Sequence, residues 1–217
     1  LPELDHHIER VPNIAPKLRK QLLEQRKLKM YGDEARVLVS KKMSLDIEYN
    51  KTELINTLHY LIQSTNLLHL ELTNNRDRVV KVSHESDKII EMICGEFNFF
   101  QKFEQKPFLK KSLWSNLLNY MGFSGYLNPF TLESNINLNI PKLNFIVTAA
   151  HEMAHQVGFA SESEANFIAF ITCIKNSDPY IRYAGLTFAM NYCYSDLLKI
   201  DPIKAKKIYE IVKPWGT

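Results

Sequence analysis

Apolar residues recur every three or four positions through most of the chain after residue 50. Residues at that spacing lie on one face of a helix, so the pattern indicates helices that each bury one side. It predicts helices at residues 52–72, 83–103, 143–157, 161–175, 179 onward and 202 onward. Thr52 and Ser83 are suitable N-caps for the first two helices, and Pro179 suits the first turn of the fifth.

Two stretches before residue 141 follow a different pattern. Residues 135–140 alternate strictly between asparagine and isoleucine or leucine, which predicts a strand with one polar and one apolar face. Residues 112–126 hold β-formers broken by Gly122 and Gly125, which predicts a strand or hairpin of low regularity. The expected fold is therefore α+β and mostly helical, with a small edge β-sheet.

The first fifty residues differ from the rest of the chain. Residues 1–20 are charged and contain three prolines, and residues 16 to about 50 are rich in Lys, Arg and Glu. This composition predicts an N-terminal helical extension at residues 1–50, with its charges in solvent, followed by one domain at residues 51–217. His6 and His7 are adjacent and cannot share a helical face, so we expect them at the surface.

The composition of the 217-residue chain is that of an ordinary globular protein, with 45% hydrophobic and 24% charged residues. The net charge of +3 is too small to predict a nucleic-acid partner. No apolar run approaches the roughly 18 residues of a membrane span. We therefore expect this chain, which begins with Leu rather than Met, to be a soluble fragment. The sequence leaves the oligomeric state open.

The three cysteines are Cys94, Cys173 and Cys193. Their number is odd and none stands in Cys-x-x-Cys spacing, which argues against a disulfide framework and against a thiolate zinc site. We expect buried thiols, the usual state of cysteines outside such sites.

The strongest chemical signal is a His-Glu-x-x-His motif at residues 151–155, inside the apolar, alanine-rich third helix. His151 and His155 are four residues apart, so both can direct a ring nitrogen at one ion. Glu152 can reach a metal-bound water, whose pKa zinc lowers to about 7, and take its proton. The alternative is two stacked histidines beside a solvated glutamate, which would leave polar groups without partners in a buried helix.

A catalytic zinc usually has three protein ligands and a water, and two glutamates compete for the third place. We expect Gly158 to end the third helix in a left-handed conformation, and Ser161 to begin the next as a capping box with Glu164. Glu162 and Asn166 share a face of that helix. Glu162 is therefore the preferred ligand, while Asn166 orients a ligand histidine from behind.

His-Glu-x-x-His followed by Glu-x-x-Ala-Asn resembles the gluzincin metallopeptidases. The resemblance implies a zincin-like domain with a Zn²⁺ cofactor. It implies zinc binding by His151, His155 and Glu162, catalysis by Glu152, and support from Asn166.

A second resemblance covers about two fifths of the chain, roughly residues 106–193. The runs from Gly125 to Thr131 and from Pro179 to Tyr183 are similar to a bacterial domain-of-unknown-function family. Members of that family look like membrane-anchored zinc peptidases with hydrophobic helices ahead of the His-Glu-x-x-His domain. This resemblance implies a bacterial source and membrane association through segments absent from this chain.

Two further roles follow from the resemblance to metallopeptidases. Such enzymes often add a hydrogen-bond donor to the oxyanion, and Tyr183 and Arg182 are the candidates; the alternative for Tyr183 is a core tyrosine bonded to a carbonyl. In zincins the strand before the metal helix commonly pairs with extended substrate, which makes Asn137 and Asn139 candidate substrate contacts. The alternative is an ordinary edge strand with a polar outer face.

The predicted function is zinc-dependent hydrolysis of a peptide or protein substrate. Glu152 acts as general base towards water and then as proton donor to the leaving amine. One alternative is a non-catalytic domain in which an ion only ties two helices together. The other is a metal hydrolase that acts on a non-peptide amide.

Overall fold

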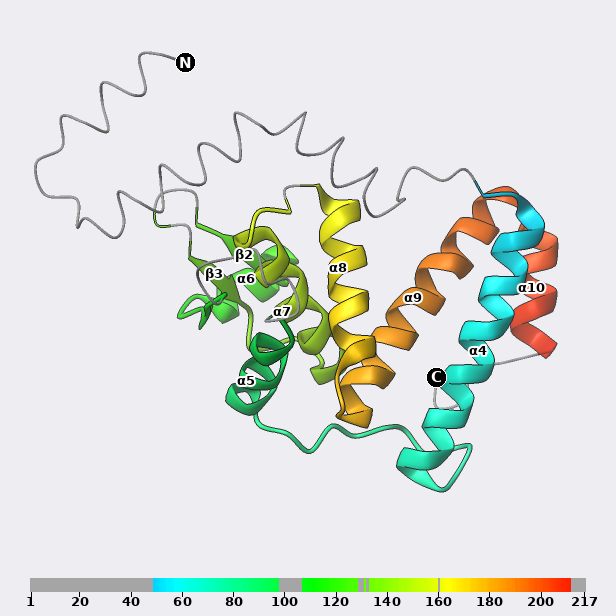
Figure 1. Ribbon diagram of the computed structural model, residues 1–217, viewed down its shortest axis with the longest axis horizontal. Helices are drawn as coiled ribbons and strands as arrows, with labels where there is room; N and C mark the ends of the chain where they lie inside the picture. Colours follow the sequence, from blue (N-terminus) through cyan, green and yellow to red (C-terminus); the bar gives the residue numbers. More distant parts are fainter. Residues whose placement is uncertain (1–48, 98–106, 129–130, 132, 160, 212–217) are drawn as a thin grey trace, which may run out of the picture. The chain divides into compact units, whose positions relative to one another are not determined.

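The computed structural model describes residues 49–97, 107–128, 131, 133–159 and 161–211 (Figure 1). Across these residues the elements follow in the order α4, α5, β1, α6, β2, β3, α7, α8, α9 and α10, all within one compact unit made of Glu48–Leu127 and Glu133–Thr217. The prediction of a mostly helical α+β fold with a small sheet is confirmed. The predicted extension at residues 1–50, with His6 and His7, lies almost wholly outside the described residues.

The three strands form one sheet in the order β1–β3–β2. Strand β3 (Ser134–Ile136) runs parallel to β1 (Leu109–Lys111) and antiparallel to β2 (Gly125–Leu127). The predicted edge strand at residues 135–140 is therefore wrong in two respects. The strand ends at Ile136, and both of its edges are paired.

Asn137 and Asn139 form the turn that follows β3. The Asn137 side chain has no exposed surface, donates to the carbonyl of Phe123 at 3.0 Å and accepts from the Asn139 amide at 2.9 Å. The Asn139 side chain donates to Asn116 Oδ1 at 2.7 Å. These side chains fix the turn. Burial of Asn137 contradicts its prediction as a substrate contact, whereas for the exposed Asn139 that role stays a prediction.

A short helix, α6 (Ser115–Met121), connects β1 to β2 where an irregular strand or hairpin was predicted. Gly122 ends this helix with a φ of 77°, a left-handed conformation that glycine adopts without strain. Gly125 begins β2. The two glycines therefore mark the end of a helix and the start of a strand, and do not interrupt one β-element.

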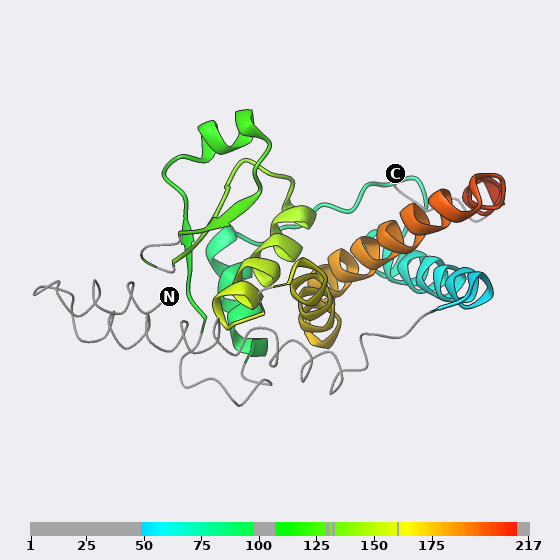
Figure 2. The same cartoon turned by 90° about the horizontal axis from the view of Figure 1, so that it is seen from above.

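Helix α7 (Lys142–Gln156) is the central helix of this unit. It packs against all three strands and against α5 (Ser86–Glu96), α8 (Glu162–Lys175) and α9 (Pro179–Ile200) (Figures 1 and 2). Six of its apolar residues are at most 1% exposed: Phe145, Ile146, Ala149, Ala150, Met153 and Ala154. The small alanines let neighbouring helices approach closely, so α7 holds its polar residues in a fixed frame.

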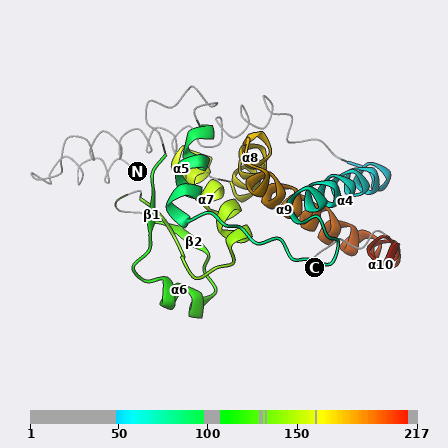
Figure 3. The same cartoon turned by 90° about the horizontal axis from the view of Figure 1, so that it is seen from below.

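A second group of helices packs α4 (Lys51–Thr73) and α10 (Pro202–Ile211) against α9 (Figure 3). Their shared core consists of Leu54, Leu58, Leu61, Ile62, Met190, Leu197, Ala205 and Ile208. None of the helices in the described part of the chain has the length and apolar character that crossing a bilayer requires.

The helix starts show where the sequence prediction was imprecise. Asn50, not Thr52, caps α4, because its side chain accepts from the Glu53 amide while the Glu53 carboxylate accepts from the Asn50 amide. The residue before α5 is Glu85, two positions after the predicted cap. The start of α9 was predicted correctly, with proline in the first turn. Its cap is Asp178, whose side chain accepts from the amides of Tyr180 and Ile181.

None of the three cysteines forms a disulfide, as predicted. Cys173 is fully buried in α8, and burial raises the pKa of its thiol to about 12. Cys94 and Cys193 are half-buried. None of the three lies among the candidate metal ligands that the described residues bring together.

Candidate metal centre

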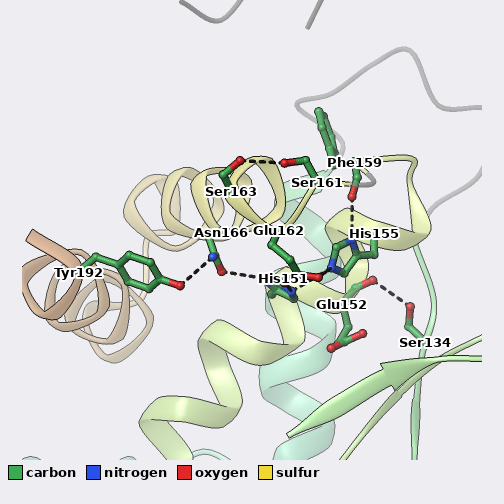
Figure 4. Close-up of polar contacts among 10 residues, drawn as sticks. All are labelled: Ser134, His151, Glu152, His155, Phe159, Ser161, Glu162, Ser163, Asn166 and Tyr192. Carbon is green, nitrogen blue, oxygen red and sulfur yellow. Dashed lines mark hydrogen bonds and ion pairs between the residues drawn. The ribbon is translucent and has the colours of Figure 1, made fainter. Parts of the chain in front are cut away.

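Three side chains from two successive helices converge on one point (Figure 4). His151 and His155 lie one turn apart on α7, and Glu162 is the first residue of α8. The two Nε2 atoms are 3.0 Å apart, and the Glu162 carboxylate oxygens lie 3.2 Å from Nε2 of His151 and 3.3 Å from Nε2 of His155. These are the three residues that the sequence analysis selected as metal ligands.

The other ring nitrogen of each histidine already has a partner. Nδ1 of His155 lies 2.7 Å from the carbonyl oxygen of Phe159, which can only accept, so Nδ1 carries the hydrogen. Nδ1 of His151 donates in the same way to Oδ1 of Asn166 at 2.9 Å. When both rings are neutral, each presents a lone pair at Nε2. Two lone pairs and a carboxylate repel one another at these distances, and a proton or a metal cation among them removes that repulsion.

The donor set fits zinc. Zinc binds imidazole nitrogen and carboxylate oxygen at about 2.0–2.2 Å in tetrahedral geometry, so two of its ligand atoms lie roughly 3.4 Å apart. The three separations in this centre, 3.0, 3.2 and 3.3 Å, are close to that value. The histidine side chains are 16% and 14% exposed and the Glu162 side chain is 78% exposed, so the centre opens to solvent on the α8 side.

The electrostatic setting keeps the first histidine neutral. Burial lowers the pKa of His151, and the neighbouring His155 ring lowers it further, against the opposing effects of Glu162 and Asn166. The neutral imidazole is the form that binds a metal.

The turn between α7 and α8 brings the third ligand into place. Gly158 has a φ of 108°, which confirms the predicted positive-φ glycine at the end of α7. This reversal of the chain brings the Phe159 carbonyl within hydrogen-bond distance of Nδ1 of His155. The predicted capping box is wrong, because the Ser161 side chain makes no capping bond to α8 and instead contacts the Ser163 hydroxyl at 2.8 Å. Glu164, the rival ligand, is a buried residue of the first turn.

Glu152 follows the first ligand in sequence but lies against the sheet. The residue is 7% exposed, and burial, with a smaller contribution from the negative charge of Glu162, raises the pKa of its carboxyl to about 7. The Ser134 hydroxyl in β3 donates to the backbone carbonyl of Glu152 at 2.9 Å. A Cβ added to Gly125 in β2 would lie 2.8 Å from Cγ and Oε1 of Glu152. Glycine at that position therefore leaves the carboxyl group its space.

Asn166 connects the centre to a third helix. While its Oδ1 accepts from His151, its Nδ2 donates to the hydroxyl of Tyr192 on α9 at 2.8 Å (Figure 4). The tyrosine hydroxyl therefore anchors the far end of the Asn166 amide to α9. The predicted place of Asn166 behind a ligand histidine matches this geometry.

Comparison with protein families gives one match. Residues 33–214, most of the chain, match the model of a family described as "Protein of unknown function (DUF3810)". This chain belongs to the DUF3810 family. Membership confirms the resemblance to a domain-of-unknown-function family and extends it well beyond residues 106–193. No curated protein matches the chain, and no solved structure does.

In this DUF3810 chain, Tyr183 lies in a hydrophobic core cluster. The residue is 5% exposed, packs with Leu68 and Val80, and its hydroxyl lies 3.3 Å from Nδ1 of His69. Its prediction as an oxyanion donor is wrong, because the hydroxyl is committed to a buried histidine. Tyr183 is therefore a core tyrosine, as the alternative proposed, except that its hydroxyl contacts a histidine ring nitrogen and not a carbonyl. Arg182 is half-buried, and its Nε has no hydrogen-bond partner among the described residues.

Three contributors to the DUF3810 centre escaped the sequence analysis. Phe159 acts through its carbonyl, so no side-chain type could signal it. Tyr192 comes from α9, and only the packing of α9 on α8 brings it to Asn166. Gly125 stood inside the run that carried the family resemblance, and that run was the available signal.

Proposed function

We propose that this DUF3810 chain is a zinc-dependent peptidase with a zincin-like domain and a gluzincin-type centre. The observation that carries the proposal is the convergence of two imidazole lone pairs and a carboxylate next to a buried glutamate. His151, His155 and Glu162 would hold the ion, and three protein ligands leave a position for water, as catalytic sites do. Bound zinc would act as a Lewis acid on the scissile carbonyl and on water.

The rest of the chemistry falls to Glu152. Its carboxylate accepts the proton of the attacking water and then delivers that proton to the nitrogen of the leaving amine. Two residues of the sheet support this position: the Ser134 hydroxyl donates to the backbone carbonyl of Glu152, and Gly125, which has no side chain, leaves room for the carboxyl group. Tyr192 and Asn166 keep the N–H of His151 directed away from the centre, which fixes the metal-binding tautomer.

Strand β2 supports a peptide as the substrate. Within the described sheet it pairs only with β3, so its other edge is the outer edge of the sheet. Its first residue, Gly125, lies against the Glu152 carboxyl. An extended peptide that adds to such an edge gains backbone hydrogen bonds, and here it would run past the general base. The edge-strand role first assigned to residues 135–140 therefore passes to β2.

The experiment combines zinc content with cleavage of a broad peptide library. Glu152→Gln keeps the size of the side chain and removes its ability to take a proton. We expect it to retain zinc and to lose about 10²–10⁴-fold in cleavage rate. Glu164→Gln, the same change at a buried glutamate of α8, is the matched control and should retain both zinc and cleavage.

Equal cleavage by wild type and Glu152→Gln would contradict the assigned mechanism. A zinc-loaded wild type that cleaves no peptide in the library would favour the non-catalytic alternative, in which the ion ties α7 to α8.

A further inference from the structure

The segment between β1 and β2 exposes an unusual amount of apolar surface. This segment belongs to a longer run, Ser112 to Leu132, that contains no Asp, Glu, Lys or Arg, in a chain that is 24% charged. Six large apolar side chains in this segment are more than half exposed. They form what we call the α6 face: Leu113 98%, Trp114 66%, Leu117 51%, Tyr120 91%, Met121 56% and Phe123 52%.

The α6 face is fixed by the fold and is not a loose end of chain. Only Ser115 and Leu118 of α6 are buried. The Ser115 hydroxyl donates to the Ser112 carbonyl at 2.7 Å and accepts from the Leu138 amide at 3.1 Å. The Phe123 amide closes the helix on the Leu118 carbonyl at 2.9 Å. These bonds hold α6 with its apolar side outward.

The exposed positions inside α6 share one side of the helix. Residues 120 and 121 are three and four positions after residue 117, so the three lie within about a third of the helix circumference, and residues 113 and 114 form the turn directly before the helix. Figures 2 and 3 show α6 beyond the ends of the strands. The exposed fractions above show that the sheet and α7 leave these side chains uncovered. A contiguous exposed apolar patch of this kind marks an interaction surface.

We propose that the α6 face docks on the surface of a lipid bilayer. Its composition is that of the membrane interface, where Trp and Tyr are enriched because their rings are apolar with one polar edge. The neutral tip is followed at its base by charged residues, among them Lys110 and Lys111 of β1. An uncharged apolar tip above a base of paired charges matches the change from acyl chains to headgroups across a membrane surface.

A second copy of the chain fits the α6 face less well. A seven-residue helix is about 10 Å long. A stable protein interface takes about 20–30 residues from each side, whereas this face offers six. Lipid has no such minimum, because each inserted side chain contributes on its own.

Net charge contributes little to this docking. Lys110 pairs with Glu133 and Lys111 pairs with Asp87, so the base of the face is close to neutral. We therefore expect binding to zwitterionic phosphatidylcholine vesicles that changes little with salt, because screening affects charge attraction and not apolar burial.

The test uses Trp114 as its own reporter. The chain has two tryptophans, so Trp215→Phe leaves Trp114 as the only one. We expect its emission to shift to shorter wavelength on addition of phosphatidylcholine vesicles, and to be quenched by lipids brominated in the acyl chain. In flotation with the same vesicles, Leu113→Ser combined with Tyr120→Ser should lower the partition coefficient by at least about tenfold.

The matched control is Leu67→Ser combined with Tyr60→Ser on α4, a leucine and a tyrosine that are 71% and 68% exposed. This pair should bind vesicles as the wild type does. The proposal is overturned if Trp114 emission does not respond to vesicles, or if both double variants lose binding equally. It is also overturned if the emission responds to protein concentration without lipid, which would assign the face to a second copy.

Discussion

Histidines lie in the interior of two regions of the molecule, and the two regions differ in which groups contact the ring nitrogens. In the core between α4 and α9, His69 has protein partners at both nitrogens: the Asn75 carbonyl at Nε2, 3.1 Å away, and the Tyr183 hydroxyl at Nδ1. At the α7–α8 centre, protein groups fill only the Nδ1 positions, and the two Nε2 atoms face each other and a carboxylate.

Under the proposed function, this difference separates a structural histidine from a ligand histidine. The protein supplies partners to both ring nitrogens of His69, so its ring ties the end of α4 to α9. The pair on α7 leaves its Nε2 atoms to each other and to Glu162, an arrangement that a bound cation would satisfy. Burial and sequence spacing alone do not make this distinction, because it depends on which atoms the rest of the fold brings to each nitrogen.

The largest expected effects come from removing one histidine from each region. His155→Ala deletes a ligand and should weaken zinc binding by more than the about 10–100-fold that outer groups contribute. His69→Ala should leave zinc affinity unchanged but lower the free energy of unfolding by about 1–3 kcal/mol, because it leaves buried polar groups unpaired. Zinc titration and urea denaturation of both variants give the comparison.

Zinc should also raise the melting temperature of wild type and of His69→Ala, but not that of His155→Ala. A zinc affinity that falls in His69→Ala and persists in His155→Ala would reverse the two assignments.

The next effect concerns the third ligand. Glu162→Gln and Glu164→Gln each remove one negative charge from the first turn of α8, so their influence on the helix dipole is similar. Only Glu162 reaches the histidines. We expect Glu162→Gln to weaken zinc binding by at least about tenfold and Glu164→Gln to leave it unchanged, as measured by competition with a zinc chelator. Loss of zinc in Glu164→Gln alone would make that residue the ligand.

The smallest effect contrasts two tyrosines of α9. Tyr192→Phe removes the hydroxyl that anchors the Asn166 amide. We expect it to weaken zinc binding by at most about tenfold, the smallest effect typical of groups behind the ligands. Its stability should change little, because the residue is 50% exposed. Tyr183→Phe should leave zinc affinity intact and cost about 0.5–1.5 kcal/mol of stability. Equal zinc affinity in Tyr192→Phe and wild type would show that Asn166 keeps its orientation without the tyrosine.

Local patterns predicted the helices and the motif that carries the centre. Every predicted helix after residue 50 is present in the structure. Helical periodicity can be predicted because it depends on residues only three or four positions apart in the sequence. The spacing of His151, His155 and Glu162 was visible for the same reason. The caps were less certain, since Asn50 with Glu53 offers a reciprocal pair of bonds that Thr52 cannot make.

Contacts between distant segments could not be predicted in this way. The alternation at residues 135–140 suggested a strand, but only pairing with β1 and β2 decides that it ends at Ile136 and lies in the middle of the sheet. The contact of Gly125 with Glu152, and that of Tyr192 with Asn166, each join segments more than twenty residues apart. Sequence spacing contains no information about such pairs.

The central claim is that His151, His155 and Glu162 hold a zinc ion. X-ray absorption at the zinc edge tests it directly, on the purified chain after loading with zinc and dialysis. We expect about one zinc per chain with only nitrogen and oxygen ligands at about 2.0–2.2 Å, including two imidazoles. A chain that retains no zinc, or a zinc with sulfur ligands at about 2.3 Å, would contradict the claim.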